Sequence, residues 1–373
     1  MDTTLPKIIA FHLPQFHPIQ ENDNWWGKGF TEWTNVSKAR PLYKGHKQPK
    51  LPSDLGFYDL RLRESRELQA SYAKKAGVYG FCYWHYWFGH GRRLLEKPVD
   101  DFLETKSPDF PFMLGWANQT WTGIWHGAKD RILIEQTYPG IDDVIAHCEV
   151  LVRHFSDQRY IKINGRPLFY IYDPYSSGFE KKYLELYRTT LSTRHNIDPY
   201  FIIKSTNFSD QKLKGLGDAY TAERLHIMRS QGHWAGGGLI DYAEKLLPWL
   251  KRRGFEDGAR NNQQVFTVDY RKAIDAIRLK EYSGDQIPCI ISNWDNTPRS
   301  GRDGWVAINS TPDNFGIHLD HIFEAKRSGP FKNIYFLKSW NEWAEGNYIE
   351  PDQDHGTQFI DVLKNKIQKF NAS

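Results

Sequence analysis

Short apolar runs recur along the 373-residue chain, and stretches with helical spacing lie between them. The runs are continuously apolar and do not alternate strictly, which is typical of parallel strands that are covered on both faces. Strands that alternate with helices predict an α/β fold. About eight strands over this length favour a closed (β/α)₈ barrel, the TIM barrel, over an open sheet. The expected strands are Ile8–Phe16, Val78–Trp87, Phe110–Ala117, Pro167–Tyr172, Tyr200–Ser205, Ala219–Ala222, Ile287–Asn293 and Ile334–Trp340.

The stretches between these runs predict helices. The clearest, Asp59–Ala76, has Leu, Ala and Tyr at helical spacing and is followed by Gly77, a residue that favours helix C-termini. Because no linker divides the sequence, we expect one domain over residues 1–373, with long loops after the strands and a loop and helix insertion around residues 223–267. The other expected helices are Ile141–Phe155, Phe179–Arg194, Leu239–Arg253, Asp269–Tyr282, Asp313–Arg327 and Gly356–Phe370.

Charge and cysteine usage disfavour several classes of protein. The formal net charge is +4 and no run of Lys or Arg stands out, so nothing suggests a nucleic-acid partner. No segment approaches the 18 or so apolar residues of a membrane span, and the N-terminus has no signal-peptide pattern. Three scattered cysteines match no zinc spacing and fit a reducing compartment. We therefore expect a soluble, cytoplasmic protein, and the sequence leaves its oligomeric state open.

The strongest signal for chemistry is SWNEWAEGNYIEP, residues 339–351, which follows the last apolar run. Glu342 and Glu345 are three residues apart, so a helical turn or tight loop places both side chains on one side. Two carboxylates beside a glycosidic bond divide the chemistry between a proton donor and a base or nucleophile. The neighbouring Trp340 and Trp343 would desolvate one carboxyl and raise its pKa, as an acid at neutral pH requires. The structural alternative is two solvated glutamates at a helix start, where the helix dipole favours negative charge.

Aromatic and polar side chains also follow the other predicted strands, at the barrel face that carries active sites. A sugar ring stacks its apolar face on an aromatic plane and needs polar partners for its hydroxyls, so 14 Trp residues indicate a carbohydrate cleft. The alternative for about half of them is packing between the barrel and its helices, because Trp is mostly buried. The predicted substrate-binding residues here are His12, Gln15, His17, Trp25, Trp26, Glu32, Trp33, Trp84, His85, Tyr86, Trp116, Asn118, Trp121, Asp173, Asn293, Asp295, Trp340, Asn341 and Trp343.

Metal and cofactor sites have little support. His12 and His17 are better explained as hydrogen-bonded wall residues than as metal ligands. The triplet Asp352-Gln-Asp354 resembles the acidic motif of many glycosyltransferases, but such triplets arise often by chance. GKGF lacks the GxxxxGK[ST] spacing of a phosphate loop, and no Rossmann-type glycine fingerprint is present. We therefore expect no metal and no cofactor.

The segments HLPQFHPIQENDNWWGKGFTEWTNV and SWNEWAEGNYIEP resemble the WbsX-like family of polysaccharide-biosynthesis proteins. That family is similar to glycoside hydrolase family 99, the endo-acting α-mannosidases and α-mannanases. The two motifs lie near opposite ends of the chain, so the resemblance spans nearly all of it. It implies a (β/α)₈ barrel and catalysis that retains the anomeric configuration.

The resemblance also implies a role for each glutamate. Glu342 matches the base that takes the proton of the substrate's 2-hydroxyl, whose oxygen attacks the anomeric carbon to give a 1,2-anhydro sugar. Glu345 matches the acid that protonates the leaving oxygen and later activates water. Glu350 matches the glutamate of IEP, with a structural or sugar-binding role. The first motif differs from family 99, which leaves the sugar open.

Three functions are compatible with these residues. We favour a retaining endo-type glycoside hydrolase for an α-mannoside or a related bacterial polysaccharide, because it depends on Glu342 and Glu345. A glycosyltransferase of O-antigen, lipopolysaccharide or capsule biosynthesis needs a nucleotide or lipid-phosphate site that the sequence does not reveal. A non-catalytic glycan-binding barrel would not need a carboxylate pair beside a desolvating Trp. Each function has an oligo- or polysaccharide as its partner.

Overall fold

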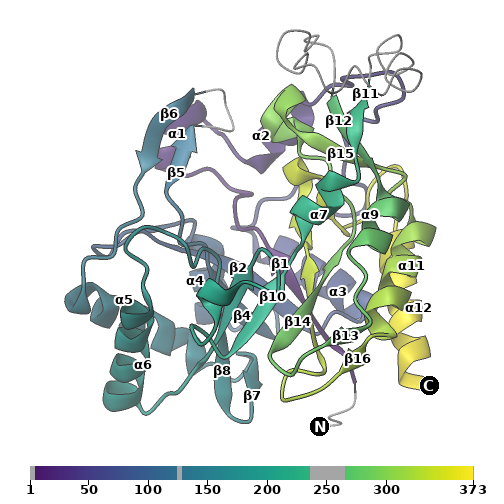
Figure 1. The fold of residues 1–373 in the computed structure, drawn as a ribbon. Helices are drawn as coiled ribbons and strands as arrows, with labels where there is room; N and C mark the ends of the chain where they lie inside the picture. The colour runs from purple at the N-terminus through teal and green to yellow at the C-terminus, as the bar shows by residue number, and fades with distance from the viewer. Residues whose placement is uncertain (1–4, 124–127, 236–264, 373) are drawn as a thin grey trace, which may run out of the picture.

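The centre of the molecule is a closed barrel of eight parallel strands (Figure 1). The computed structural model describes residues 5–123, 128–235 and 265–372. Strand β1 pairs in parallel with both β2 and β17, which closes the barrel. The predicted (β/α)₈ barrel is therefore confirmed. Its strands are β1 Lys7–His12, β2 Gly80–Trp87, β4 Phe112–Trp116, β8 Arg166–Ile171, β9 Tyr200–Ser205, β10 Ala219–Ala222, β14 Gln286–Ile291 and β17 Ile334–Lys338.

Aromatic side chains fill the interior of the barrel. The Phe11 ring of β1 stacks on Trp84 of β2 and Phe336 of β17, with ring centroids 4.7 and 5.1 Å apart, and meets Tyr170 of β8 edge-on at 5.0 Å. All four side chains are buried. The barrel is therefore a packed core and not a channel, and it presents the residues at its strand ends on a rigid base.

Helices cover the outer face of the barrel, as Figure 1 shows for α3, α5, α6, α11 and α12. Helix α3 ends before Gly77, whose φ of +80° suits glycine. The helices are α1 Gln20–Trp26, α2 Glu32–Lys38, α3 Arg63–Ala76, α4 Lys97–Thr105, α5 Ile141–Phe155, α6 Lys181–His195, α7 Leu225–Ser230, α9 Tyr270–Ala276, α10 Thr297–Ser300, α11 Pro312–Phe323 and α12 Gln358–Ala372, with 3₁₀ turns η2 Gln211–Leu213, η4 Gly301–Asp303 and η5 Trp343–Glu345.

Three predicted helices are shorter than expected, and one of them, Asp59–Ala76, begins only at Arg63. The predictions Asp269–Tyr282 and Asp313–Arg327 are wrong at their C-terminal ends, where β13 Glu281–Tyr282 pairs in parallel with β16 Lys326–Arg327. That pairing requires extended backbone in both segments. The predicted helix Leu239–Arg253 lies outside the described residues, as does much of the expected insertion at 223–267. The single-domain organisation stays a prediction.

Smaller elements lie beyond the carboxyl ends of the barrel strands, at the top of Figure 1. A hairpin of β5 Trp121–Gly123 and β6 Ala128–Ile134 lies near α1, and a sheet of β11 His233–Ala235, β12 Val265–Asp269 and β15 Trp305–Ile308 lies near α2. These elements surround the barrel end that carries the site. The remaining short strands are β3 Arg93–Leu94, β7 Lys162–Ile163, β18 Asn341–Glu342 and β19 Asn347–Tyr348. Within the described ranges, every helix is too short or too polar to cross a bilayer.

Candidate active site

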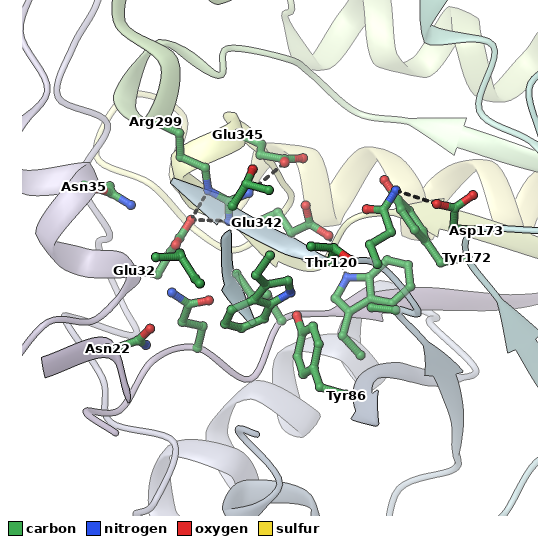
Figure 2. A pocket seen from close by; sticks show the side chains of 18 of the residues that line it. Asn22, Glu32, Asn35, Tyr86, Thr120, Tyr172, Asp173, Arg299, Glu342 and Glu345 are labelled. Atoms are coloured by element: carbon green, nitrogen blue, oxygen red, sulfur yellow. Dashed lines mark hydrogen bonds and ion pairs between the residues drawn. The ribbon is translucent and has the colours of Figure 1, made fainter. Parts of the chain in front are cut away.

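A pocket of about 580 Å³ opens at the carboxyl ends of the barrel strands (Figure 2). Its lining comes from the ends of β1, β2, β4, β8, β14 and β17 and from the segments that follow them. Barrel enzymes bind their substrates at this face. The predicted site residues that line the pocket are Gln15, Trp26, Glu32, Trp84, Tyr86, Trp121, Asp173, Glu342 and Glu345.

A tight turn after β17 presents the two glutamates. Strands β18 and β19 pair antiparallel, and the 3₁₀ turn η5 connects them. Gly346 ends this turn with φ +55°, and a Cβ at that position would lie 2.6 Å from the backbone N of Asp295. Only glycine fits there, because the left-handed φ and the close approach both exclude a side chain. In this turn, Glu342 and Glu345 both line the pocket.

Glu342 is buried and sits among hydrogen-bond donors. Its Oε1 accepts from Trp84 Nε1 at 2.9 Å and from Ser339 Oγ at 3.2 Å, and its Oε2 lies 3.8 Å from Lys338 Nζ. Burial by itself raises the pKa of Glu342, but the Lys338 ammonium, a hydrogen bond from Glu345 and the Arg299 charge outweigh it and lower the pKa. Glu342 is therefore a carboxylate at neutral pH, as a base must be.

Glu345 has the opposite electrostatic environment. Its Oε1 accepts from Arg299 Nη1 at 2.7 Å, and its Oε2 lies 3.9 Å from Lys338 Nζ. Burial and the negative charge of Glu342 raise the pKa of Glu345 above its ordinary value, against the opposing effect of both cations. Glu345 therefore holds a proton near neutral pH. Two carboxyls with pKa values pushed apart are the arrangement that gives one acid and one base.

The two cations of the pocket, Arg299 and Lys338, were not singled out from the sequence. Arg299 lies on α10 and donates from Nη2 and Nε to Glu32 Oε1 at 2.5 and 2.9 Å. Lys338 Nζ lies 3.6 Å from Glu223 Oε1. Lys338 ends the apolar run NIYFLK, and a lysine at the end of a predicted barrel strand is a sequence signal that could have identified it as a pocket residue. Arg299 lies in a segment without a recognisable pattern, so only the fold brings it to the glutamates.

Thirteen further residues that were predicted to contact substrate do not line the pocket. Most of them are buried, and many of their polar atoms bond to other protein groups, so a role as substrate contacts stays a prediction. Trp25 is half-buried and meets the Trp121 ring edge-on at 6.0 Å. The set comprises His12, His17, Trp25, Trp33, His85, Trp116, Asn118, Asn293, Asp295, Trp340, Asn341, Trp343 and Glu350.

Glu350 is the centre of one buried network behind the pocket. It accepts from Trp343 Nε1 at 2.7 Å, Tyr58 Oη at 2.8 Å and Gln69 Nε2 at 2.7 Å, and burial raises the pKa of Glu350 to about 7. Gln69 Oε1 in turn bonds to His12 Nε2 at 3.1 Å. This network ties the turn that carries Glu342 and Glu345 to β1 and α3, and it occupies polar atoms of Glu350 and His12 with protein partners.

Three other residues fix the loops around the pocket. Asn118 bonds to both the backbone N–H and C=O of Asp173, which holds that residue in the lining. Asp295 accepts from His46 Nε2 at 2.8 Å and from Gln48 Nε2 at 2.7 Å. Asn293 Oδ1 accepts from the Tyr348 backbone N–H. Asn118, Asp295 and Asn293 therefore hold the loops around the pocket in position.

The remaining residues of this set pack within the wall. Trp33 Nε1 donates to the Tyr58 carbonyl and Trp116 Nε1 to the Trp87 carbonyl. Trp340 is fully buried. The imidazoles of His17 and His85 also have protein partners: His17 Nδ1 lies 3.0 Å from the Pro14 carbonyl oxygen, and His85 Nε2 lies 2.8 Å from His147 Nε2.

Asn341 joins the turn that carries Glu342 and Glu345 to the end of the first strand, β1. Its Oδ1 accepts from the Leu13 N–H at 2.7 Å, and its Nδ2 donates to the Leu13 carbonyl at 3.0 Å. We expect Asn341→Ala to lower the free energy of unfolding by about 2–4 kcal/mol, because it leaves two buried backbone groups unpaired. Urea titration measures this. Asn24→Ala is the control: this exposed asparagine accepts a hydrogen bond from the Gln20 side chain, and its loss should change stability by less than about 0.5 kcal/mol. A raised KM with unchanged stability in Asn341→Ala would contradict the structural role.

Among the described residues, no group of three or more His, Cys, Asp and Glu side chains is arranged to hold a metal ion. Residues 124–127 and 236–264 are outside this statement. The expectation that the protein needs no metal stays a prediction.

Two solved structures share this architecture. The glycoside hydrolase family 99 endo-α-mannosidase of Bacteroides thetaiotaomicron is 14% identical with a TM-score of 0.54, over 98% of this chain and 97% of that one. A glycoside hydrolase-like protein is also 14% identical with a TM-score of 0.58, over 98% and 95%. At such low identity the likeness shows a shared fold.

Sequence relatives are more specific. The protein WxcX of Xanthomonas campestris pv. campestris is 32% identical over an alignment of 374 positions, which covers 98% of this chain and 50% of WxcX. The chain thus spans about half the length of the curated relatives it matches. The model of the family described as Glycosyltransferase WbsX matches residues 8–363. The chain therefore belongs to the WbsX family.

Proposed function

We propose that the protein is a retaining, endo-type glycoside hydrolase that acts on an α-mannoside or a related bacterial polysaccharide. Membership of the WbsX family supports an enzyme that acts on carbohydrates. The observation that carries the hydrolase proposal is the pair Glu342 and Glu345, which line one pocket with pKa values displaced in opposite directions. A binding module needs no such pair.

The proposed reaction has two steps. In the first, the Glu342 carboxylate takes the proton of the substrate's 2-hydroxyl, the 2-oxygen bonds to the anomeric carbon, and the leaving oxygen departs with the proton of Glu345. In the second, Glu345 takes a proton from water, the water oxygen bonds to the anomeric carbon, and the 2-oxygen recovers its proton from Glu342. Two inversions at one carbon retain its configuration.

The rest of the pocket suits a sugar. Tyr86 and Trp121 supply aromatic surfaces, while Gln15 and Asp173 supply hydrogen-bonding groups. Figure 2 shows Asp173 and Tyr172 on the side of the pocket opposite Glu32 and Arg299, with Glu342 and Glu345 between. A pocket with polar groups on both sides of the glutamates fits a chain of sugars that crosses the cleaved bond.

The proposed roles predict a bell-shaped pH dependence of kcat/KM. The rate rises as Glu342 loses its proton, and because its pKa is lowered, this limb falls below the ordinary range of a glutamate. The rate then decreases as Glu345 loses its proton, and because its pKa is raised, this limb falls above that range. Initial rates measured from about pH 3 to about pH 10 locate both limbs. A profile that is flat through the neutral range and above contradicts Glu345 as the acid.

Product stereochemistry tests the proposed function directly. Incubation with a panel of α-mannans and bacterial polysaccharides should release oligosaccharides, and proton NMR at early times should show the anomer of the substrate. An initially inverted product would exclude the retaining mechanism. The absence of release from every member of the panel, with purified sugar nucleotides giving transfer instead, would replace the hydrolase proposal.

A glycosyltransferase is the second candidate, favoured by the description of the family. Against it, both pocket cations that could meet a diphosphate, Arg299 and Lys338, are already ion-paired with glutamates. We expect activity to survive treatment with a chelator, since carboxylates alone supply the proposed chemistry. Assays before and after dialysis against EDTA check this. Activity that disappears and returns with a divalent ion favours the transferase.

A further inference from the structure

Three segments from distant parts of the chain meet at the Arg299 guanidinium. Glu32 begins α2 after β1, Arg299 lies on α10 after β14, and Glu345 ends η5 after β17. The Arg299 side chain is only 15% exposed and Glu32 only 1%. Figure 2 shows the guanidinium between the two carboxyls. Arg299 is therefore a buried connection between the first motif of the chain and the candidate acid.

The guanidinium divides its donors unequally. Nε and Nη2 both donate to Glu32 Oε1, and Nη1 donates to Glu345 Oε1. A planar, rigid fork fixes the direction of each N–H. Since Arg299 occupies Oε1 of Glu345 as an acceptor, the transferable proton of Glu345 belongs on Oε2.

Glu32 uses its bonding capacity on protein groups. Its Oε1 accepts both bonds from Arg299, and the Ala344 backbone N–H, next to Glu345, also lowers the pKa of Glu32. Only 1% of the Glu32 side chain is exposed, so little of its carboxylate is accessible to a sugar hydroxyl. Burial raises the pKa of Glu32, whereas the Arg299 charge and its hydrogen bonds oppose that effect. In its ionised form, Glu32 offsets the charge of Arg299.

Charged and titratable groups from several elements of the described chain affect the pKa of Glu345. The groups that face it are Glu342 of β18, Lys338 of β17, Arg299 of α10 and Tyr86 of β2, with Glu32 of α2 behind Arg299 and Glu223 behind Lys338. The two cations favour the carboxylate form of Glu345, which a general acid must avoid before the reaction. Glu32 shields one cation as Glu223 shields the other.

We propose that Glu32 is a positioning residue for the general acid, which holds Arg299 in place and offsets its charge so that Glu345 keeps its proton. The proposal deepens the proposed function and rests on it for the role of Glu345. Under this proposal, Glu32 of the motif GFTEW acts on the charge and position of Arg299 and is not a sugar contact.

The decisive measurement needs no substrate. The free energy of unfolding of the protein minus that of its Glu345→Gln variant, followed against pH, isolates the ionisation of Glu345. The folded state raises the pKa of Glu345, so this difference declines as pH rises above the pKa that Glu345 has in the unfolded chain. It levels off at the pKa that Glu345 has in the folded protein, and we call that pH the levelling pH. Repeated with Glu32→Gln in both proteins, the difference should level off about one pH unit lower or more, because Arg299 then acts on Glu345 without an opposing charge.

Matched variants separate this effect from a general loss of stability. Glu21→Gln removes a carboxylate of α1 whose ion-pair distance to Arg92 is 3.9 Å, and it should leave the levelling pH unchanged. The double change Glu32→Gln with Arg299→Met removes both charges and should return the levelling pH toward, or above, that of the unaltered protein. If Glu32→Gln is too unstable to titrate, Glu32→Asp, which withdraws the carboxylate from Arg299, should move it in the same direction by less.

Enzyme kinetics give the second readout. In Glu32→Gln, the alkaline limb of kcat/KM should move to lower pH by the same amount, with KM little changed. A levelling pH that does not move in Glu32→Gln, or a raised KM with an unmoved alkaline limb, overturns the proposal and restores Glu32 as a sugar contact. A protein that shows the stability shift but hydrolyses no glycan would instead contradict the proposed function and leave the Glu32 coupling in place.

Discussion

Glu342→Gln is expected to lower kcat/KM by about 10² to 10⁴, whatever the leaving group of the substrate. The ring-closing attack needs a base on the 2-hydroxyl, and a neutral amide cannot take that proton. Glutamine has nearly the same shape as glutamate, and its Oε can still accept from Trp84 Nε1 and Ser339 Oγ, so the fold should persist. Initial rates with an aryl glycoside and with an oligosaccharide, supported by thermal unfolding of the variant, measure the effect.

A 2-deoxy substrate provides the matched chemical control. It lacks the oxygen that attacks the anomeric carbon, so the unaltered enzyme should not cleave it. A covalent sugar ester isolated on Glu342 or Glu345 would point to ordinary double displacement and would remove the special role of Glu342.

Glu345→Gln should separate the two kinds of substrate. A natural sugar leaving group needs protonation as the bond breaks, so its kcat/KM should decrease by about 10² to 10⁴. An activated phenol leaves without a proton, so its first step should be much less affected. Rates on the two substrates, measured with the same preparation, give the ratio. The alkaline limb of the pH profile should also disappear, because the group with the raised pKa has been removed.

Equal losses on both substrates would contradict the acid role of Glu345. If both variants keep full activity on a confirmed substrate, the site lies elsewhere in the molecule.

The architecture was predictable because local signals and the fold agree. Continuous apolar runs mark strands covered on both faces, and all eight predicted strands occur in the barrel. The errors lie at element ends. The prediction Ile8–Phe16 extends beyond β1, which stops at His12, because the Leu13 N–H bonds to the Asn341 side chain and leaves the strand pairing. Such a partner, 328 residues away, has no local signature.

The candidate site was predictable in part for a similar reason. Residues at strand ends are placed at the pocket face by topology alone, which is why Trp84, Asp173 and Glu342 line the pocket. Alternation within a strand then sends neighbours to opposite faces. Trp84 and Tyr86 line the pocket, while His85 between them is buried against His147 outside the barrel interior.

The sequence by itself determined the barrel, the face that carries the site and the two glutamates, because each depends on residues close together in the chain. Tertiary structure decided the electrostatics. Arg299 and Glu32 are 267 positions apart and Arg299 and Glu345 are 46 apart, and only the closed barrel brings their charges within hydrogen-bond distance. The protonation of a carboxyl depends on burial and on charges within a few ångströms. The sequence therefore named Glu342 and Glu345, and the family resemblance implied which is the base and which is the acid. Only the fold shows the charges that displace their pKa values in opposite directions.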